Sequence, residues 1–276
     1  MKLITDSGTL MSQQQALDLN ITLLPLQVAV AGKNYRDYFE LASDTFVEMI
    51  KHAVPTSSQP AIGEVIEAYE NVKEALHITM TKGLSATYDS ALGILESGGF
   101  KHITLFNSKT LAGTQKYLVE LAAKLIDGTP VEQIIERMEG CLTQCQSYLI
   151  PSDFDFLRRG GRLTPIAATL SGLMRIKPIV IQTEGSLKLE KFAVARTMSK
   201  ALDQIVEKMI QNGVDFRHKV YISHAFNMEA AQMAFDKIKE KIQNIEIDVL
   251  ELSPVMITQG GPGCLAVQYI LKDNGQ

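Results

Sequence analysis

Ser85 and Thr87 are the hydroxyl side chains whose surroundings point most directly to ligand chemistry. The residues of Leu76–Thr81 predict a short buried strand, and Gly83 permits a tight turn after it. A helix is predicted to begin here with Ser85 as its N-cap, because apolar residues recur at helical spacing as far as Leu95. Free backbone N–H groups at such a helix end, together with the two hydroxyls, favour an anion. The stretch therefore predicts an anion site, with a plain helix cap as the alternative.

A second polar stretch lies between Pro55 and Pro60. It presents Ser57, Ser58 and Gln59, and Pro60 keeps the preceding residue out of the helical region. We expect a stiff loop that offers hydroxyls and an amide to a ligand. The alternative is a surface connection, because loops rich in Ser and Pro commonly play that part.

Cationic side chains gather within 20 residues near the middle of the chain: Arg158, Arg159, Arg162, Arg175 and Lys177. Gly160 and Gly161 stand within this group, which favours contact with an anion or with a partner protein. The alternative is a solvated helix end, since cations are favoured at helix C-termini.

Ser85 also raises the hypothesis of a small-molecule hydrolase or acyltransferase that uses this residue as nucleophile. The stretch Gly83–Thr87 does not fit the GxSxG nucleophile elbow, because Thr87 stands where the second glycine would be. The discriminating observation is a His within hydrogen-bond reach of Ser85 Oγ. The five His show no metal-ligand spacing, and the sequence contains neither a Walker loop nor GxGxxG. No metal and no redox cofactor are therefore expected.

Composition predicts a chain that folds around ordinary apolar cores. It has 276 residues, of which 46% are hydrophobic, and no run of 18 apolar residues that would predict a transmembrane span. We expect a soluble cytoplasmic protein, and a net charge of −4 argues against a nucleic-acid partner. Cys141, Cys145 and Cys264 are an odd number and are expected to be reduced thiols, the first two on a helix.

The order of strands and helices predicts two domains. In the first half they alternate, which predicts βαβ units and a mainly parallel sheet. In the second half, strands at Lys177–Gln182 and Leu187–Val194 predict an antiparallel hairpin, and Pro165–Leu173 has a helical pattern. We predict an α/β fold in which residues 1–150 form an N-terminal α/β/α layer with a mainly parallel sheet. Residues 151–276 form a C-terminal α+β domain with a mixed sheet.

The order of the polar motifs resembles that of the DegV family, bacterial fatty-acid-binding proteins that serve a fatty acid kinase. The resemblance extends over nearly the whole chain, and several motifs in one order are more specific than any one alone. These motifs are Thr5-Asp6-Ser7, Ser57-Ser58-Gln59-Pro60, Gly83-Leu84-Ser85-Ala86-Thr87-Tyr88-Asp89-Ser90-Ala91, Arg159-Gly160-Gly161-Arg162-Leu163, Lys177-Pro178-Ile179, Arg196-Thr197 and Gly261-Pro262-Gly263.

The resemblance implies a two-domain α/β protein that holds a long-chain fatty acid in a buried tunnel between the domains. Such a protein is not itself the catalyst. It presents the acyl carboxylate to a partner kinase with a dihydroxyacetone-kinase-like domain, which makes acyl phosphate for phospholipid synthesis. The fatty acid is then a ligand, and no cofactor is implied.

Carried over by position, Ser57 and Ser85 would bind the carboxylate, with Gln259 and Thr87 completing the site. Arg196 and Arg162 are the candidates for contact with the kinase. A lipid-sensing partner of another protein, acting through the segment Arg158–Lys177, is a further hypothesis. The sequence departs from the family pattern at three of these motifs, with Ser57 in place of Thr, Ala86 in place of Gly and Gln259 in place of His. A neutral amide donates a hydrogen bond but supplies no charge to a carboxylate.

Overall fold

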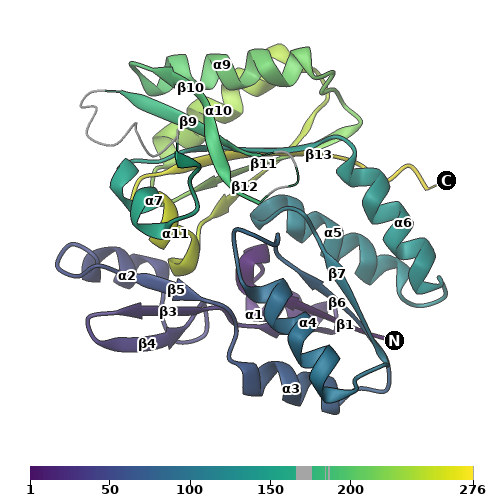
Figure 1. Cartoon of the computed structure of the whole chain (residues 1–276). Coiled ribbons are helices and arrows are strands. Elements are labelled where there is room, and N and C mark those ends of the chain that lie inside the picture. Colours follow the sequence, from purple (N-terminus) through teal and green to yellow (C-terminus); the bar gives the residue numbers. More distant parts are fainter. Residues whose placement is uncertain (166–175, 184, 186, 276) are drawn as a thin grey trace.

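The structure is a computed structural model that describes residues 1–165, 176–183, 185 and 187–275. Within these ranges the strands form a parallel four-stranded sheet, a mixed six-stranded sheet and a smaller three-stranded sheet. Figure 1 shows the two larger sheets in separate layers, with helices on their faces and between them. The predicted two-domain α/β fold is confirmed. Among the described residues, no helix has both the length and the apolar character needed to cross a membrane.

The four-stranded sheet has the order β2 (Ile21–Leu24), β1 (Lys2–Asp6), β6 (Ala75–Thr79) and β7 (Ile103–Asn107), and its neighbouring strands all run parallel. Side chains alternate across a strand. Leu76 and Ile78 therefore face α5 (Ala112–Leu125) and α6 (Val131–Leu142), whereas Ala75 faces α3 (Ile62–Glu70) and α4 (Thr87–Gly98). The short helix α1 (Gln13–Asp18) follows the 3-10 turn η1 (Ser7–Thr9). This arrangement confirms the predicted α/β/α layers.

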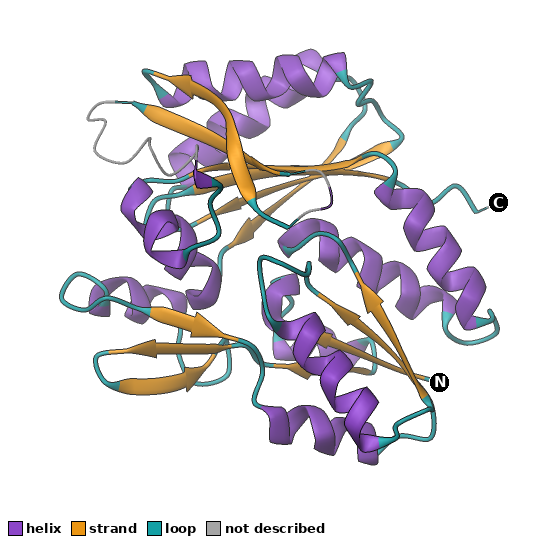
Figure 2. Cartoon of the chain, in the orientation of Figure 1, coloured by secondary structure: helices purple, strands orange, loops and turns teal. Residues whose placement is uncertain are grey.

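The six-stranded sheet has the order β10, β9, β8, β13, β11, β12, and only its β11–β12 pair is parallel. Helices α9 and α10 pack on one face through apolar side chains, and Figure 2 shows them together on the outer side of the molecule. The short helices α7 and α11 lie near the opposite face. The bounds are β8 (Cys145–Ile150), α7 (Phe154–Gly160), β9 (Lys177–Gln182), β10 (Leu189–Ala195), α9 (Met198–Gln211), β11 (His218–His224), α10 (Met228–Lys241), β12 (Glu246–Glu251), α11 (Pro254–Gly260) and β13 (Leu265–Leu271).

The stretch predicted as a loop between Pro55 and Pro60 contains a strand. In the three-stranded sheet, β3 (Gln27–Val30) pairs antiparallel with both β4 (Lys33–Arg36) and β5 (Thr56–Ser58), and α2 (Ser43–Met49) packs beside it. Ser57 lies opposite Val28 in the β5–β3 register, and Val28 is fully buried. Opposite residues of an antiparallel pair share one face. The pairing therefore turns Ser57 inward, which a free surface loop would not do.

One further sequence prediction is wrong, and one short helix was not predicted. Cys145 is the first residue of β8 rather than the end of a helix, since α6 ends at Leu142. The helix α11 was not predicted, because its seven residues are too short to show a helical period. Strand β8 precedes residue 151 but pairs within the six-stranded sheet, so the domain division at residue 150 stays a prediction. The helix predicted for Pro165–Leu173 extends into residues that lie outside the described ranges.

Candidate functional site

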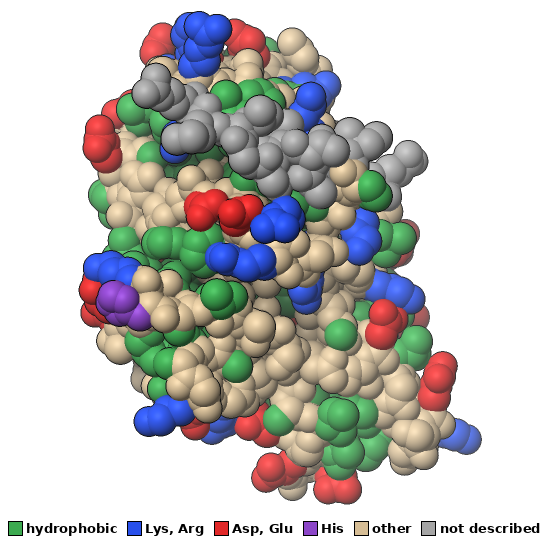
Figure 3. All heavy atoms as spheres, turned by 60° about the vertical axis from the view of Figure 1, so that its left-hand side comes forward, with side chains coloured by type: hydrophobic (Ala, Val, Ile, Leu, Met, Phe, Trp, Pro, Cys, Tyr) green, Lys and Arg blue, Asp and Glu red, His purple; other side chains and the backbone are tan. Residues whose placement is uncertain are grey.

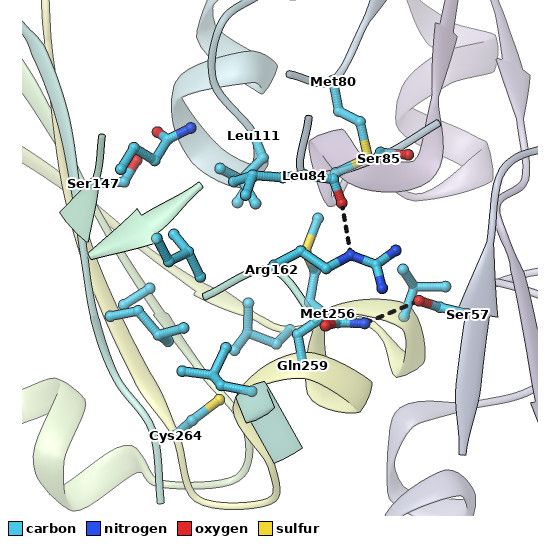
Figure 4. Close-up of a pocket in the computed structure, with 18 of the residues that line it drawn as sticks. Ser57, Met80, Leu84, Ser85, Leu111, Ser147, Arg162, Met256, Gln259 and Cys264 are labelled. Carbon is cyan, nitrogen blue, oxygen red and sulfur yellow. Dashed lines mark hydrogen bonds between the residues drawn. The ribbon is translucent and has the colours of Figure 1, made fainter. Parts of the chain in front are cut away.

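A cavity of about 260 Å³ lies where β5, the turn before α4, helix α11 and the inner face of the six-stranded sheet meet. Figure 4 shows the side chains that surround it. Most of them are apolar, and they come from both halves of the chain: Leu26, Met80, Leu84, Leu111, Ala112, Leu149, Leu157, Val180, Leu189, Leu252, Val255, Met256, Cys264 and Ala266. Such a lining offers a ligand a dry environment with little polar competition.

Ser57 and Gln259 meet on one side of the cavity although they are 202 positions apart in the sequence. The Gln259 Nε2 group donates a hydrogen bond to Ser57 Oγ at 3.0 Å (Figure 4). The Gln259 Oε1 atom is buried and has no hydrogen-bond partner among the described residues. The structure thus brings together two of the predicted ligand residues, one from β5 and one from α11.

Gly160 lies directly against the Gln259 side chain. A Cβ atom built on Gly160 would lie 2.2 Å from Gln259 Oε1, well inside any real contact. From the sequence, the two glycines that follow Arg159 favoured contact with an anion or with a partner protein. Gly160 proves to be the place where α7 and α11 approach each other closely.

Ser85 lines the cavity from the turn before α4, but it is not the N-cap of that helix. The helix begins at Thr87 with Ala86 as its N-cap, and no side chain caps it. The Ser85 Oγ atom instead accepts a hydrogen bond from the Thr87 backbone N–H at 3.2 Å, a local turn that competes with capping. A 2.8 Å hydrogen bond joins the Ser85 and Thr87 hydroxyls. Thr87 is buried and does not line the cavity, so its part in the site is to hydrogen-bond to Ser85.

Arg162 also lines the cavity, where the sequence had predicted a contact with a partner. Its Nε atom donates to the Leu84 carbonyl at 3.2 Å, and its NH1 atom donates to the Gly160 carbonyl. In Figure 4 its guanidinium lies between the Ser85 turn and the Ser57–Gln259 pair. A cation therefore stands among the hydroxyls. The Arg159–Arg162 motif held the only sequence signal for this position.

Gly83 lets the β9–β10 hairpin close against the Ser85 turn. Its backbone has φ of +88°, and a Cβ atom there would lie 2.7 Å from the Leu187 backbone. Glycine meets both requirements, the positive φ and the close approach. Leu84 and Leu189, which follow these two contact points, both line the cavity. The hairpin of the second half therefore helps to enclose the site of the first half.

Two buried carboxylates, Asp6 and Asp37, hold in place segments that line the cavity. Asp6 accepts from the Met80 backbone N–H at 2.7 Å, and Asp37 accepts from Ser7 Oγ at 2.7 Å and from the Val255 backbone N–H at 3.1 Å. Burial raises the pKa of each of these two carboxyls to about 6, although the hydrogen bonds they accept act in the opposite direction. The Thr5-Asp6-Ser7 motif thus holds the segment after β6 and the first turn of α11 in place.

Ser85 has no general base among its contacts. None of the five His residues lines the cavity, and the hydrogen bonds of Ser85 Oγ in the described structure go to Thr87. His77, the His of β6, is fully buried and bonds to Tyr69. The geometry therefore gives no support to a hydrolase or acyltransferase that uses Ser85.

Arg196, the last of the predicted residues, lies outside the cavity, whereas three polar residues of the sheet that were not predicted line it. Arg196 is exposed in the link between β10 and α9 and does not line the cavity. Ser147, Gln182 and Gln268 line it from three strands and were missed by the sequence analysis. They lie in largely apolar strands, where single polar residues give no distinctive sequence signal.

Comparison with known proteins extends the description of the whole chain. A family model described as "Uncharacterised protein, DegV family" matches residues 1–272. A DegV domain-containing protein of Listeria innocua is 30% identical over 280 residues, which cover 98% of each chain.

Solved structures agree with that match. The crystal structure of DegV from Bacillus subtilis, titled a fatty acid binding protein, has a TM-score of 0.84 and 27% identity and covers 98% of this chain and 99% of its own. A DegV family protein from Thermus thermophilus has a TM-score of 0.88 with 24% identity, at 98% and 99% coverage, which shows the fold. With its motifs, its fold and a family match from residue 1 to residue 272, this chain belongs to the DegV family.

Proposed function

We propose that this protein binds a long-chain fatty acid in the cavity between its sheets. The carboxylate would lie among Ser57, Ser85 and Arg162, with Gln259 adding a hydrogen bond. The observation that carries the proposal is the make-up of the cavity, which joins an apolar body to hydroxyls and a cation on one side. An amphiphile with one charged end and a long apolar tail matches that distribution.

The energetics favour the same ligand class. Burying roughly fifteen methylenes at about 0.8 kcal/mol each gives a gross gain on the order of 12 kcal/mol before ordering costs. The head group then needs only to be oriented and neutralised. Hydroxyl donors and one guanidinium suffice for that, because hydrogen bonds to a charged acceptor are about twice as strong as neutral ones.

The nearest support outside the molecule is the Bacillus subtilis relative, whose title names it as a fatty acid binding protein. At 27% identity over nearly the whole chain, that likeness supports the same ligand class here. Support from the cavity and support from this relative are independent of each other.

We further propose that the protein is a carrier rather than a catalyst. It would present the acyl carboxylate to a fatty acid kinase with a dihydroxyacetone-kinase-like domain, in the cytoplasm, for phospholipid synthesis. The basic residues of α7 and the exposed Arg196 are the candidate contacts. Figure 3 shows Lys and Arg side chains in the middle of one face of the molecule, with acidic side chains beside them, and these basic groups are where an anionic partner surface would dock.

The ligand class is tested by extracting the purified native protein with organic solvent and analysing the extract by mass spectrometry. We expect close to one fatty acid per chain from protein made in bacteria without added lipid. The same protein is then delipidated and refilled with a fluorescent fatty acid, with stearic acid as competitor and stearyl alcohol as the uncharged control. Well-folded protein that yields no fatty acid and takes none up would overturn the proposal.

A further inference from the structure

A second polar patch lies on the sheet side of the cavity. Ser147 of β8 is directly opposite Gln268 of β13 in the antiparallel register. The β8–β9 pairing, with Tyr148 opposite Ile181, brings Gln182 of β9 to the other side of Ser147. These three side chains, named here the strand row, all line the cavity. They form a polar line across three neighbouring strands.

The strand row lies apart from the residues proposed to hold the carboxylate. In Figure 4, Leu111 lies between Ser147 and the Leu84–Ser85 turn, and Ser57 is on the opposite side of the cavity. Along β13, Gln268 is four residues beyond Cys264, which is roughly 14 Å of strand. Cys264 packs close to Gly260, the residue after Gln259. A ligand with its head beside Gln259 would therefore meet the strand row well along its tail.

Gln268 fixes the hydrogen-bonding direction of the strand row. Its Oε1 atom accepts from the Gly113 N–H at 3.1 Å, and its Nε2 atom donates to the Leu111 carbonyl at 3.0 Å and to Ser147 Oγ at 2.7 Å. Gln268 is thus satisfied by the protein. Because Ser147 Oγ accepts from Gln268, its own hydrogen is available to another acceptor.

Gln182 supplies the observation that points to a ligand. Its side chain is 9% exposed, and its Nε2 group is buried without a hydrogen-bond partner among the described residues. An amide left unpaired in a dry cavity is costly, so such groups are usually met by a partner. Its neighbour across the strands is Ser147. Two residues along the same two strands, on the same face of the sheet, are the apolar Val180 and Leu149. Because both residues line the cavity, one oxygen atom on a ligand would accept from Ser147 Oγ and, once the Gln182 amide turns toward the cavity, from Gln182 Nε2.

We propose that the strand row is a subsite for a neutral oxygen group on the acyl chain, so that the protein prefers hydroxylated fatty acids to plain ones. This inference rests on the proposed fatty-acid binding and adds the kind of acyl chain. A hydroxyl suits the subsite because it accepts from the two donors and donates in turn to Gln182 Oε1. A second carboxylate does not suit it, since the strand row contains no cation to offset the cost of burying a charge.

The test measures dissociation constants for stearic acid and for a positional series of hydroxystearic acids. We expect one position far from the carboxylate to bind about fivefold to tenfold more tightly than stearic acid, the range of one or two neutral hydrogen bonds. A hydroxyl close to the carboxylate should give no gain. A series in which no distal position binds better than stearic acid overturns the inference.

Variants assign the preference to the strand row. Gln182→Leu should abolish the gain while stearic acid binds equally well or better, because the unpaired amide is gone. For the same reason the unliganded variant should melt at a higher temperature than the parent. Ser147→Ala, a smaller change, should reduce the gain in part. Gln232→Leu, at an exposed position of α10, is the matched control and should leave the preference unchanged.

The outcomes separate this inference from the proposed function. Wild type that binds stearic acid without any hydroxyl preference leaves fatty-acid binding intact and overturns the subsite. A preference that survives both Gln182→Leu and Ser147→Ala also overturns it. Wild type that binds neither kind of acid overturns the proposed function, and the subsite with it.

Discussion

Ser85 acts through the turn that presents it rather than through a helix cap. Its hydroxyl is already engaged with Thr87, whose own hydroxyl is 2.8 Å away. This pairing orients Ser85 Oγ in the free protein, which would limit the entropy lost in the proposed binding of a carboxylate. Ala86, at the true N-cap, has no side-chain acceptor of its own, and in the first turn it is Ser85 Oγ that accepts from the Thr87 N–H.

Ser85→Ala should weaken binding of a long-chain fatty acid roughly tenfold to a hundredfold, the value of one hydrogen bond to a carboxylate. The apolar wall is unchanged, so measurable affinity remains. The dissociation constant is compared with that of Ser97→Ala, because the Ser97 hydroxyl lies on α4, the helix after Ser85, and its hydrogen bonds in the described structure stay within that helix. Equal affinity for Ser85→Ala and wild type would place the head-group site elsewhere.

Arg162→Gln should reduce the preference for a fatty acid over the corresponding fatty alcohol. The guanidinium lies beside the hydroxyls and is held by the Leu84 and Gly160 carbonyls, neither of which neutralises its charge. We expect at least a tenfold loss in affinity for the ionised acid and little change for the alcohol. Arg158→Gln is the control, because that arginine is exposed and already paired with Asp155. An equal loss for acid and alcohol would show that Arg162 supports packing rather than charge recognition.

At the scale of elements, the site depends on a short helix held at its first turn by a buried carboxylate. Helix α11 has only seven residues, and isolated helices of that length are not stable. Asp37 accepts the Val255 N–H, and Ser253 Oγ accepts the Met256 N–H at 3.4 Å. These contacts fix the helix that contributes Met256 and Gln259 to the cavity.

Because the pKa of Asp37 is raised, its contribution to the stability of the fold depends on pH. Burial raises the pKa from 3.8 to about 6, so the folded chain keeps a proton that the unfolded chain loses between these values. Stability should therefore fall as pH rises from about 4 to about 6 and then level off. A difference of about two pKa units corresponds to up to about 3 kcal/mol.

Asp37→Asn removes this titration, and the measurement is the free energy of unfolding of variant and wild type from pH 4 to pH 7. Relative to the variant, wild type should lose stability between pH 4 and pH 6. Asp44→Asn, an exposed acid of α2, serves as control because it should leave the wild-type slope in place. Parallel pH curves for Asp37→Asn and wild type would contradict a buried, titrating Asp37.

At the scale of the whole molecule, the cavity is enclosed only because the two halves of the chain meet. The Gly83 turn contacts the β9–β10 hairpin, and Arg162 of the second half bonds to Leu84 of the first. Arg196 lies outside this enclosure, at the start of α9. This arrangement separates the residues proposed to hold a ligand from the residue proposed to meet a partner.

Arg196→Ala should keep the lipid content of the protein and reduce acyl-phosphate formation at least tenfold in an assay reconstituted with the kinase. The expected loss has a simple reason, since the variant removes an exposed charge and no cavity contact. Lys200→Ala, one turn along α9 and also exposed, is the matched control. Loss of bound lipid in Arg196→Ala would reject the docking role and assign the residue to folding or ligand binding.

Local pattern determined the type of most elements in this protein. Alternation of strands and helices predicted the parallel sheet, and the two apolar runs around Gly185 predicted the β9–β10 hairpin. The motif order predicted the family and three residues that line the cavity: Ser57, Ser85 and Gln259. These features depend on neighbours in sequence, on turn residues and on side-chain periodicity, which a sequence displays directly.

Only the tertiary structure decided which distant residues meet. The Ser57–Gln259 hydrogen bond joins residues 202 positions apart, and the Asp37–Val255 bond joins residues 218 apart. Ser57 faces inward because it lies opposite the buried Val28 in the β5–β3 register. The strand row forms because its three residues lie side by side on one face of three paired strands. Arg162 was expected to contact a partner, but in the folded chain it lines the cavity. Contacts of this kind depend on how complete elements pair and pack, and no local stretch of sequence contains that information.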